Sequence, residues 1–568
     1  IKMKTKFSGI LTLLLALVVQ ISFAQEKTIS GTVTDDSGLP LPGVNIIVKS
    51  TTNGTQSDFD GNYSISTEVG QSLVYSYVGF DSQEKLVTAS SGMMNVTMAQ
   101  GETLDAVVLT GYGGATKERK SLGYAVTTLQ ADEIENKPES DVVRSLNGKV
   151  AGVQIVGNSG ATGSGTNFVI RGRSSINGSN QPLFIVDGVP FDSGTNQQTG
   201  FGGGNTVTSS RFLDLDPNNV ESVQILKGLS ASVLYGQQGR NGVVLITTKN
   251  GSNKDLNKKF EVTVNSSVYQ TEISNLADYQ NEYGQGADNT INSGYVGNWG
   301  ARFDAGLEVS HPYASFGNLF PEYDGLKIPY VAAPNNVKDF FRTGLGQSMS
   351  VNVAGSPGND GNTRYNLNFG YTTEDGYIRN NGLTRYNIGL GGSTKLSNKF
   401  SFNGTANFSS TRVNTPPIAA NNAGGALSIF TRTLFMPRNL DLNNIPYENP
   451  NDRSSVYYRT DQENPRWLSN YAGSEQKTNR FYGKLGASYE ISDNASISYR
   501  FGLDTYNETQ EFKAARGSVT APYTTGYLRT TSGTNFIYDH NLNFSFNNIE
   551  LADEFSLTTQ LGFNARRD

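Results

Sequence analysis

The chain has 568 residues, so several structural units are expected rather than one ordinary domain. Its net charge is −6 at pH 7 and its 45 basic residues are spread along the sequence, which excludes the basic surface that nucleic-acid binding needs. The chain has no cysteine and only two histidines, His311 and His540, which excludes disulfide frameworks, thiol catalysis and a histidine-rich metal site.

Residues 1–24 are typical of a secretory signal peptide. Lys2, Lys4 and Lys6 precede an apolar run over residues 10–19, and Ser22-Phe23-Ala24 places small residues at positions −3 and −1 of a cleavage site. The apolar run is shorter than the ~20 residues that a membrane-spanning helix needs. We expect export with cleavage after Ala24; a short anchor helix kept in the mature protein is the alternative. Met3 is the expected initiator.

Residues 26–100 alternate short β-rich runs with turn residues, which predicts a small β-sandwich. The segment Asp58-Phe59-Asp60-Gly61-Asn62 superficially suggests a calcium loop. An EF-hand needs glycine at the sixth loop position and glutamate at the twelfth, where this chain has Tyr63 and Val69. A tight hairpin turn is therefore the favoured interpretation.

Residues 101–114 are expected to form a linker that contains an extended apolar segment. The segment comprises Leu104, Asp105, Ala106, Val107, Val108 and Leu109, and Gly111 and Gly113 after it interrupt regular structure. Such a segment can add a strand to a partner's sheet through main-chain hydrogen bonds. An ordinary edge strand has the same appearance, so the string alone does not decide its role.

Residues 115–250 mix helical and strand patterns. Ser140 is expected to cap a helix that carries Val142, Leu146 and Val150, and Asp216-Pro217 to begin a second short helix. Strands are predicted at residues 153–156, 167–171, 183–186, 222–226 and 243–247. The result would be a compact α+β domain.

This domain resembles the plug of TonB-dependent receptors in residues 168–172 (FVIRG), 182–190 (PLFIVDGVP) and 223–249, and the last run resembles the SusC/RagA family in particular. The signature residues are Arg171, Gly172, Asp187, Gly188, Lys227, Gly228, Tyr235, Gly236, Asn241 and Gly242. Residues 26–100 are similar to the carboxypeptidase-regulatory-like domain, a non-catalytic module, through residues 31–33, 42–44 and 60–63. The family has this order of parts, so the resemblance covers essentially the whole chain and implies that residues 104–109 are the TonB box.

Residues 256–568 alternate apolar and polar side chains, as in segments 364–371, 400–408, 495–504 and 555–563. The chain is only 36% hydrophobic yet has 28 tyrosines and 29 phenylalanines, a mixture typical of a membrane β-barrel. Arg364, Lys484, Arg500 and Asp504 would face a wet lumen, and aromatics such as Tyr489 and Phe501 would face lipid. A soluble β-sandwich or propeller also alternates and is the alternative. The predicted fold is mostly β: an antiparallel transmembrane barrel plugged by an α+β domain and preceded by a small sandwich.

About nine or ten barrel strands can be identified, whereas importers with a plugged lumen typically have ~22, so the barrel is expected to be incomplete in this chain. Long inserts at residues 271–344 and 412–478 are expected to be external loops, because periplasmic turns are short. These inserts carry Trp299, Tyr457, Tyr458 and Trp467, which fit sugar stacking, interfacial girdles and packed loops equally well.

The resemblance implies an importer in a Gram-negative type of outer membrane, without catalytic activity, cofactor or metal. Residues 160–165 are glycine-rich but lack the Lys-Ser/Thr pair of a phosphate-binding loop. The implied partners are TonB, a SusD-like surface lipoprotein and a bulky nutrient, expected to be an oligosaccharide or other glycan. A peptide cargo and a non-transporting surface or signalling receptor are the alternatives, and no substrate-binding residue is assigned.

Overall fold

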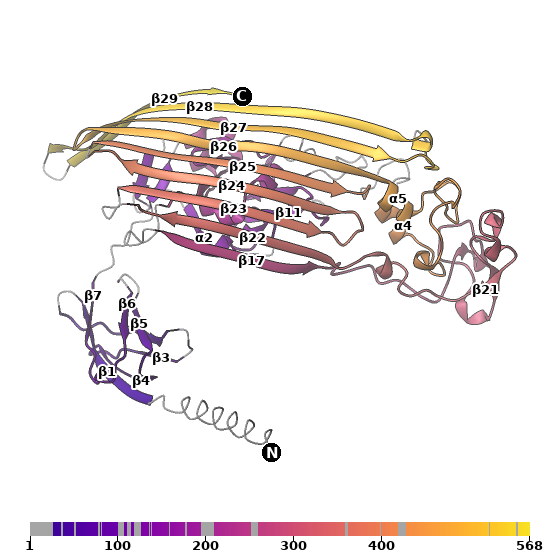
Figure 1. The fold of residues 1–568 in the computed structure, drawn as a ribbon, viewed down its shortest axis with the longest axis horizontal. Coiled ribbons are helices and arrows are strands. Elements are labelled where there is room, and N and C mark those ends of the chain that lie inside the picture. Colours follow the sequence, from indigo (N-terminus) through magenta and orange to yellow (C-terminus); the bar gives the residue numbers. More distant parts are fainter. Residues whose placement is uncertain are drawn as a thin grey trace, which may run out of the picture. The chain divides into compact units, whose positions relative to one another are not determined.

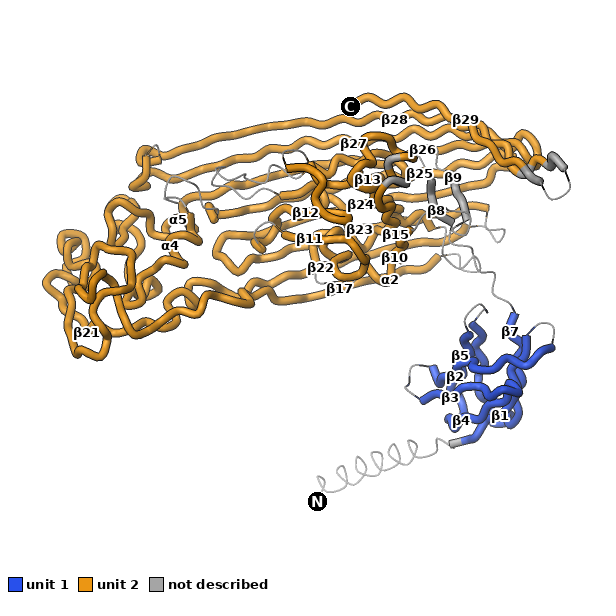
Figure 2. Tube along the Cα trace, turned by 180° about the vertical axis from the view of Figure 1, so that it is seen from behind, with its two compact units in different colours: residues 1–108, 117–122 blue, residues 109–116, 123–568 orange. Residues whose placement is uncertain are grey.

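The computed structural model describes residues 26–568 apart from residues 36–37, 50, 52, 78–79, 81, 100–106, 111–114, 119–125, 136, 138, 158–159, 177–178, 195–208, 252–259, 358–361, 398, 419–427, 522 and 553–554 (Figure 1). The predicted signal peptide, with its cleavage position after Ala24, lies outside the described residues. The chain separates into two compact units, residues 1–108 with 117–122 and residues 109–116 with 123–568 (Figure 2). In the described part of the chain, no helix is long and apolar enough to cross a membrane.

The first unit is a β-sandwich, as the sequence predicts. Its two sheets have the strand orders β4-β1-β7 and β3-β2-β5-β6. The strands are β1 (Glu26–Asp35), β2 (Asn45–Val48), β3 (Gly54–Gln56), β4 (Asn62–Glu68), β5 (Ser72–Ser76), β6 (Gln83–Leu86) and β7 (Val96–Met98). Alternate side chains, such as Ile29 and Leu73, enter one apolar core, and the hydroxyls of Tyr63 and Tyr75 lie 2.6 Å apart across it.

The Asp58–Asn62 segment is a tight turn between β3 and β4. Oδ1 of Asp58 accepts hydrogen bonds from the backbone N–H groups of Asp60 at 3.0 Å and Asn62 at 2.8 Å. Gly61 has φ of +76°, which a glycine adopts without strain. The turn interpretation is therefore confirmed, although β3 and β4 belong to different sheets and do not form a hairpin.

The predicted plug is an α+β domain built on a five-stranded sheet of order β10-β15-β16-β13-β14, with a separate β11-β12 hairpin. Its elements are β10 (Val126–Gln130), α2 (Ala131–Ile134), η2 (Arg144–Leu146), β11 (Val153–Gly157), β12 (Thr166–Ile170), β13 (Leu183–Val186), β14 (Val189–Phe191), η3 (Arg211–Asp214), η4 (Pro217–Asn219), β15 (Val220–Leu226), α3 (Leu229–Tyr235), η5 (Gly236–Asn241) and β16 (Val243–Thr248). Phe168, Phe184 and Phe212 stack in its core. We call this region, residues 126–250, the plug.

The helix predicted after Ser140 is wrong. Only the 3₁₀ turn η2 forms there. The Asp141 carboxylate accepts hydrogen bonds from the backbone N–H of Val143 at 2.8 Å and from Oγ1 of Thr166 in β12 at 2.6 Å, and these bonds hold the segment in a non-helical conformation. The apolar positions Leu146 and Val150 are nevertheless buried, so the spacing identified the core correctly. The second predicted helix exists as the 3₁₀ turn η4, which the Asp216 side chain caps.

The predicted barrel region forms one antiparallel sheet of nine strands, in agreement with the nine or ten expected. They are β17 (Glu261–Thr271), β22 (Gly344–Gly355), β23 (Thr363–Asp375), β24 (Gly382–Lys395), β25 (Phe400–Thr415), β26 (Ala472–Ser492), β27 (Ala495–Ala514), β28 (Tyr527–Ala552) and β29 (Phe555–Arg567). Each strand pairs with the next in this order, and β17 and β29 are the edges of the sheet as described. The plug covers one face of this sheet, as the two opposite views show (Figures 1 and 2).

Two insertions between strands fold together at one end of the sheet. They occupy residues 272–343 and 416–471, slightly less than predicted because β25 and β26 extend further. Their elements are β18 (Gly286–Ala287), β19 (Thr290–Ile291), η6 (Phe303–Ala305), β20 (Glu308–Ser310), η7 (Ala314–Phe316), η8 (Pro321–Tyr323), β21 (Lys327–Pro329), η9 (Lys338–Phe340), α4 (Ile429–Leu434), η10 (Leu442–Asn444) and α5 (Pro465–Tyr471); η11 (Tyr523–Thr525) follows β27. Tyr313 and Phe320 from the first insertion share a core with Met436 and Leu440 from the second. We call this the insertion module.

Candidate functional site: the plug and the polar face of the sheet

The predicted TonB box is partly within the described structure. Leu104, Asp105 and Ala106 lie outside the described residues, whereas Val107, Val108 and Leu109 belong to β8 (Val107–Thr110). β8 pairs with β9 (Ala115–Glu118) in a two-stranded sheet, so one edge of β8 pairs with no other described strand. The role of this segment as a TonB box stays a prediction.

Two pairs of signature residues form turns that require a left-handed backbone. Asp187 (φ +53°) and Gly188 (φ +83°) make the two-residue connection of the β13–β14 hairpin, the conformation of a type I′ turn. Arg171 (φ +56°) and Gly172 (φ +95°) end β12, and the backbone N–H of Arg171 donates to the carbonyl of Gly152 at 2.8 Å. These positions are therefore set by backbone geometry.

The other signature residues allow close packing or fasten loops within the plug. A Cβ on Gly228 would meet the Arg171 guanidinium at 2.6 Å, and one on Gly242 would meet the Ile170 side chain at 2.6 Å. Lys227 donates to the carbonyl of Ala151 at 2.7 Å. Nδ2 of Asn241 donates to the carbonyls of residues 179 and 181 at 2.9 and 3.1 Å. Tyr235 is buried at the end of α3, and Gly236 follows it with φ of +61°. The structure thus gives these residues scaffold roles.

The two faces of the nine-stranded sheet differ in polarity, and the difference is the reverse of that in a soluble protein. Large apolar side chains on the outer face are exposed, for example Leu367 (46%), Phe408 (41%) and Tyr489 (43%). Polar side chains on the inner face are buried, such as Asn366 and Asn407. A barrel wall with lipid outside and a filled interior requires this pattern.

The plug meets the inner face through hydrogen bonds to buried amides and hydroxyls. The carboxylate of Asp187 accepts from Oγ1 of Thr405 in β25 at 2.7 Å, so the hairpin signature also anchors the plug. Nδ2 of Asn368 donates to Asp216 at 3.0 Å, and Nδ2 of Asn219 donates to Oδ1 of Asn407 at 2.8 Å. The inner face is thus a polar cradle for the plug.

Two glycines in the strands of the sheet allow the plug backbone and side chains to lie this close to the inner face. A Cβ at Gly370 would clash with the Asp216 carboxylate, and one at Gly389 would lie 2.7 Å from the amide of Asn219. Oδ1 of Asn368 and Nδ2 of Asn407 have no protein partner among the described residues. Buried groups of this kind are normally satisfied by water, so this part of the interface is expected to be hydrated.

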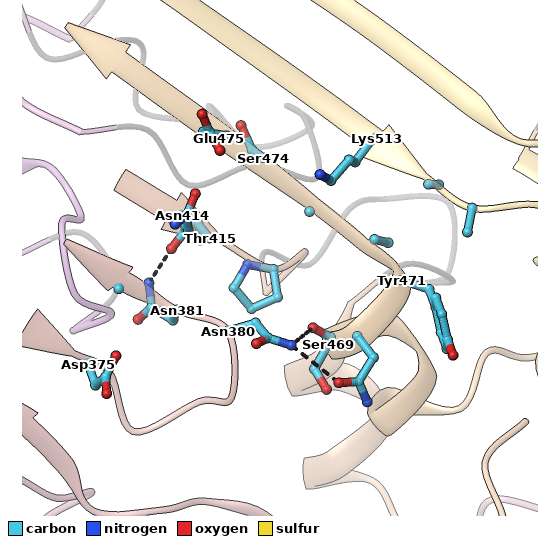
Figure 3. Close-up of a pocket in the computed structure, with 17 residues that line it drawn as sticks. Asp375, Asn380, Asn381, Asn414, Thr415, Ser469, Tyr471, Ser474, Glu475 and Lys513 are labelled. Atoms are coloured by element: carbon cyan, nitrogen blue, oxygen red, sulfur yellow. Dashed lines mark hydrogen bonds between the residues drawn. The ribbon is translucent and has the colours of Figure 1, made fainter. Parts of the chain in front are cut away.

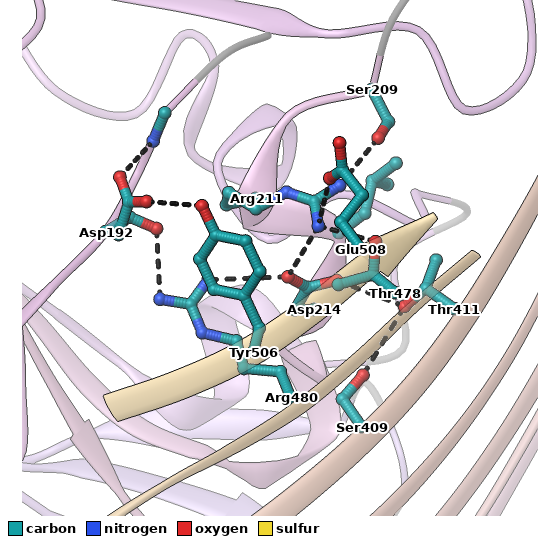
Figure 4. Close-up of polar contacts among 12 residues, drawn as sticks. Asp192, Ser209, Arg211, Asp214, Ser409, Thr411, Thr478, Arg480, Tyr506 and Glu508 are labelled. Carbon is teal, nitrogen blue, oxygen red and sulfur yellow. Dashed lines mark hydrogen bonds and ion pairs between the residues drawn. The ribbon is translucent and has the colours of Figure 1, made fainter. Parts of the chain in front are cut away.

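A buried ion network forms the second part of the plug–sheet interface (Figure 4). Arg480 of β26 is fully buried and forms a two-pronged pair with Asp504 of β27, at 2.7 and 2.5 Å. The same guanidinium reaches the plug: it lies 3.3 Å from the Asp214 carboxylate, donates to the carbonyl of Asp192 at 3.0 Å and stacks over the Phe191 ring at 3.4 Å. The Arg480 side chain of the sheet therefore contacts three residues of the plug: Phe191, Asp192 and Asp214.

Arg211 of the plug completes the network from the other side. It pairs with Glu508 of β27 at 2.9 Å and donates to Oγ1 of Thr478 in β26 at 2.6 Å. The hydroxyl of Tyr506 donates to the Asp192 carboxylate at 2.6 Å. Sequence reasoning placed Asp504 on the lumen side but missed its partners. The available signal was Arg480 on the polar face of an alternating strand.

Burial also affects a carboxyl group within the plug itself. Desolvation raises the pKa of Glu139, while the nearby Arg144 guanidinium opposes the shift. Arg144 donates to Oγ1 of Thr166 at 2.8 Å and to the carbonyl of Ser164 at 2.7 Å, so it fixes the glycine-rich loop 160–165. The loop is thus held by plug side chains.

A hollow of about 710 Å³ lies where the ends of β23–β27 meet α5 (Figure 3). Its walls combine polar side chains, such as Asn414, Glu475 and Lys513, with apolar ones, such as Pro416 and Ala514. Nδ2 of Asn380 donates to the carbonyl of Ser469 at 2.8 Å, which ties the β23–β24 turn to the insertion module. The hollow is a recess of mixed polarity at the insertion end of the sheet.

The four insert aromatics singled out in the sequence have different environments. Trp467 is fully buried and its Nε1 donates to the carbonyl of Arg453 at 2.8 Å. Tyr457 is buried in a different core of the module, and Tyr458 packs against that second core. Trp299 is 65% exposed. The packed-loop interpretation is therefore correct for three of the four residues.

Two family models match the chain. Residues 118–243 match the TonB-dependent Receptor Plug Domain and residues 29–109 match the CarboxypepD_reg-like domain. The TonB-dependent receptor SusC of Bacteroides thetaiotaomicron is 37% identical over 249 residues, which are 44% of this chain and 23% of that receptor. The TonB-dependent receptor P39 of Formosa agariphila is 31% identical over 383 residues, which are 67% of this chain and 32% of that receptor. The matched part is thus at most about a third of either relative's length.

A solved structure with the same fold is the RagAB peptide importer in its open-open state. It aligns with a TM-score of 0.57 and 19% identity over 81% of this chain and 53% of that chain. The closed-closed state aligns with the same TM-score and identity over 78% of this chain and 47% of that chain. These relatives are receptors and importers, not enzymes. The two domain matches and the SusC relative support the identification of this chain as a SusC/RagA-like TonB-dependent receptor, and the RagAB structures show that the fold is shared.

Proposed function

We propose that this chain is the N-terminal part of an active importer for a bulky nutrient. The observation that carries the proposal is the plug seated on the inner face of the sheet through the Arg480 and Asp187 contacts. In a closed barrel this plug fills the lumen, so nothing large passes until the plug moves. An outer membrane holds no gradient of its own, so the work has to come from a partner in the periplasm.

TonB is the proposed source of that work, acting on residues 104–109. Among the described strands only β9 pairs with β8, and this supports the role, because strand addition needs main-chain groups that a partner strand can meet. The plug interface also suits a pulling mechanism. Many of its contacts are hydrogen bonds and ion pairs, which water can replace as the plug moves, whereas a wholly apolar interface would resist hydration.

The proposed arrangement has a cleaved signal peptide (1–24), a regulatory-like domain (26–100), a linker with the TonB box (101–114), a plug (115–250) and the first part of the barrel (256–568). A SusD-like lipoprotein would help to capture cargo on the outside, as a lid. We propose an oligosaccharide as the cargo. A peptide is the second candidate, because RagAB, which shares this fold, is a peptide importer.

The competing function is a surface receptor that does not transport. A signalling receptor of this type would be expected to carry a secretin-like domain before the TonB box. In this chain a β-sandwich that matches the CarboxypepD_reg-like domain precedes it. This supports import.

Deleting residues 104–109 from the full-length protein tests the proposal. We expect cells with the deletion to bind substrate at the surface as the parent does but to lose uptake, because TonB has no strand with which to pair. Labelled substrate at the surface and inside the cell would be measured separately. A control deletion of the same length, residues 119–124 between β9 and β10, should retain uptake. Accumulation of substrate by the 104–109 deletion would contradict the mechanism.

A further inference from the structure

We propose that Trp299 and Tyr283, both in the first insertion of the insertion module, form a stacking platform for a sugar ring of an uncharged oligosaccharide. This rests on the proposed import function and assigns to it a substrate class and a first contact. The two rings lie 5.6 Å apart at an angle of 49°, and Trp299 is 65% exposed. Tyr295, three residues on from Asn292, is 45% exposed and extends the same loop surface.

The loop that carries Trp299 holds it in one place. Its backbone N–H donates to the carbonyl of Gly286 at 3.1 Å, and its own carbonyl accepts from the N–H of Asn289 at 3.0 Å. Gly286 (φ +141°) and Gly300 have no room for a Cβ, because one would run into neighbouring backbone carbonyls. A pre-formed aromatic surface binds more tightly than a mobile one, because less side-chain freedom is lost.

The loop is also fixed to the second insertion. Oδ1 of Asn298 accepts from the backbone N–H of Arg438 at 2.7 Å, and the backbone N–H of Gln285 donates to Oδ1 of Asn439 at 2.9 Å. The guanidinium of Arg438 is itself buried and bonded within the module. The side chain of Trp299 is therefore exposed, while the loop that carries it is fixed by hydrogen bonds.

The charges beside the platform select the ligand class. Arg302 lies over the Tyr283 ring at 5.5 Å and is paired with Asp304 at 3.1 Å and Glu282 at 3.6 Å. The exposed Asp288 adds a further negative charge close to the Asn289 turn. Arg302 is thus outnumbered by the neighbouring carboxylates, which accept hydrogen bonds from sugar hydroxyls but repel anionic ligands. The apolar C–H face of a pyranose suits the negative face of an aromatic ring.

Two other occupants fit the surroundings less well. An interfacial girdle would lie on the strands beside the apolar outer face, but Trp299 is in the insertion that begins after β17 ends at Thr271. A protein partner needs a contiguous apolar centre within about 800 Å² of surface per side. Within three residues of Trp299 on either side, Val296 is the one large apolar residue, and the others are Gly297, Asn298, Gly300, Ala301 and Arg302.

The test measures binding by the full-length protein in detergent, without uptake. A glycan array with uncharged and uronic-acid polysaccharides identifies bound sugars, and fluorescence titration gives affinities for the parent and for Trp299→Ala, Trp299→Tyr and Phe435→Ala. We expect uncharged glycans to bind, Trp299→Ala to weaken binding about 10-fold and Trp299→Tyr less than about 3-fold. Phe435, 68% exposed in the same module, is the control and should change nothing.

The proposal is overturned if Trp299→Ala binds every array sugar as the parent does, or if no array sugar binds. It is also overturned if the variant instead loses a peptide ligand or a co-purifying lipoprotein. Unchanged thermal unfolding of Trp299→Ala shows that any loss is not misfolding. Because binding is measured apart from transport, sugar binding that depends on Trp299 in a protein without uptake would refute the import function and leave this site standing.

Discussion

The plug and the insertion module both pack against the same set of strands, but different interactions hold them. The plug meets the sheet through buried charges and amides, among them Arg480, Asp214 and Asn407, and through smaller apolar contacts such as that of Phe191 with Tyr482. The insertion module is joined by an apolar core in which Trp467 and Leu468 contact Phe340 of the other insertion and Phe512 of β27. Polar contacts can be exchanged for water, whereas an apolar core is lost as a whole. The comparison indicates a plug that can be displaced and a module that stays assembled.

The largest expected effect is the loss of the module's core. Trp467→Ala removes the largest fully buried side chain and the donor to the carbonyl of Arg453, and should lower the free energy of unfolding of the module by about 4 kcal/mol. Limited proteolysis of residues 272–343 and 416–471 in the full-length protein would report it. Trp299→Ala is the matched control, since that side chain is exposed. Equal protease resistance of the two variants would mean that the apolar core does not hold the module.

Breaking the ion network should give the next largest loss of stability. This loss should be measurable in the plug. Arg480→Met keeps most of the side-chain volume but leaves Asp504 buried without its cation and leaves Asp214 with only the Arg211 guanidinium, at 3.6 Å. We expect a cost of about 3 kcal/mol. We expect faster hydrogen–deuterium exchange in β14 and η3 of the plug, measured by mass spectrometry. Exchange in the insertion module should not change.

Arg412→Met is the control for the network. Arg412 also pairs with a carboxylate, Glu475, at 3.4 Å, but both side chains are exposed on the outer face and such pairs contribute less than about 1 kcal/mol. If both methionine variants leave plug exchange unchanged, the plug is held by something other than this network.

The sequence could predict where strands and turns form. It could not predict which side chains pair with each other in the folded protein. Alternation identified the strands of the sheet and the face of Asp504, because a strand's side-chain direction depends only on position. Turn chemistry likewise predicted the turn at residues 58–62. The pairing of Asp214 with Arg480 joins residues 266 positions apart, and no local pattern encodes it. Trp467 and Trp299 look alike in sequence, and only the folded insertions separate the buried ring from the exposed one. Ser140 failed as a cap because Asp141 makes tertiary bonds that override local propensity.

The smallest expected effect is a loss of module stability in mild acid, through His311. Its ring stacks on Tyr323 at 4.0 Å and its Nδ1 accepts from the backbone N–H of Tyr313 at 3.1 Å, while desolvation lowers the pKa of the imidazole. The unfolded chain therefore takes up a proton first as the pH falls below about 6.5, so the stability contributed by neutral His311 is present above that pH and is lost as the pH falls toward the folded-state pKa. Hydrogen exchange of the module at pH 7.5 and pH 5.5 should show faster opening in acid, and His311→Gln should remove the difference while His540→Gln should keep it. A module that becomes more stable in acid would show that the imidazole is held as a cation, which its acceptor role toward the Tyr313 N–H opposes.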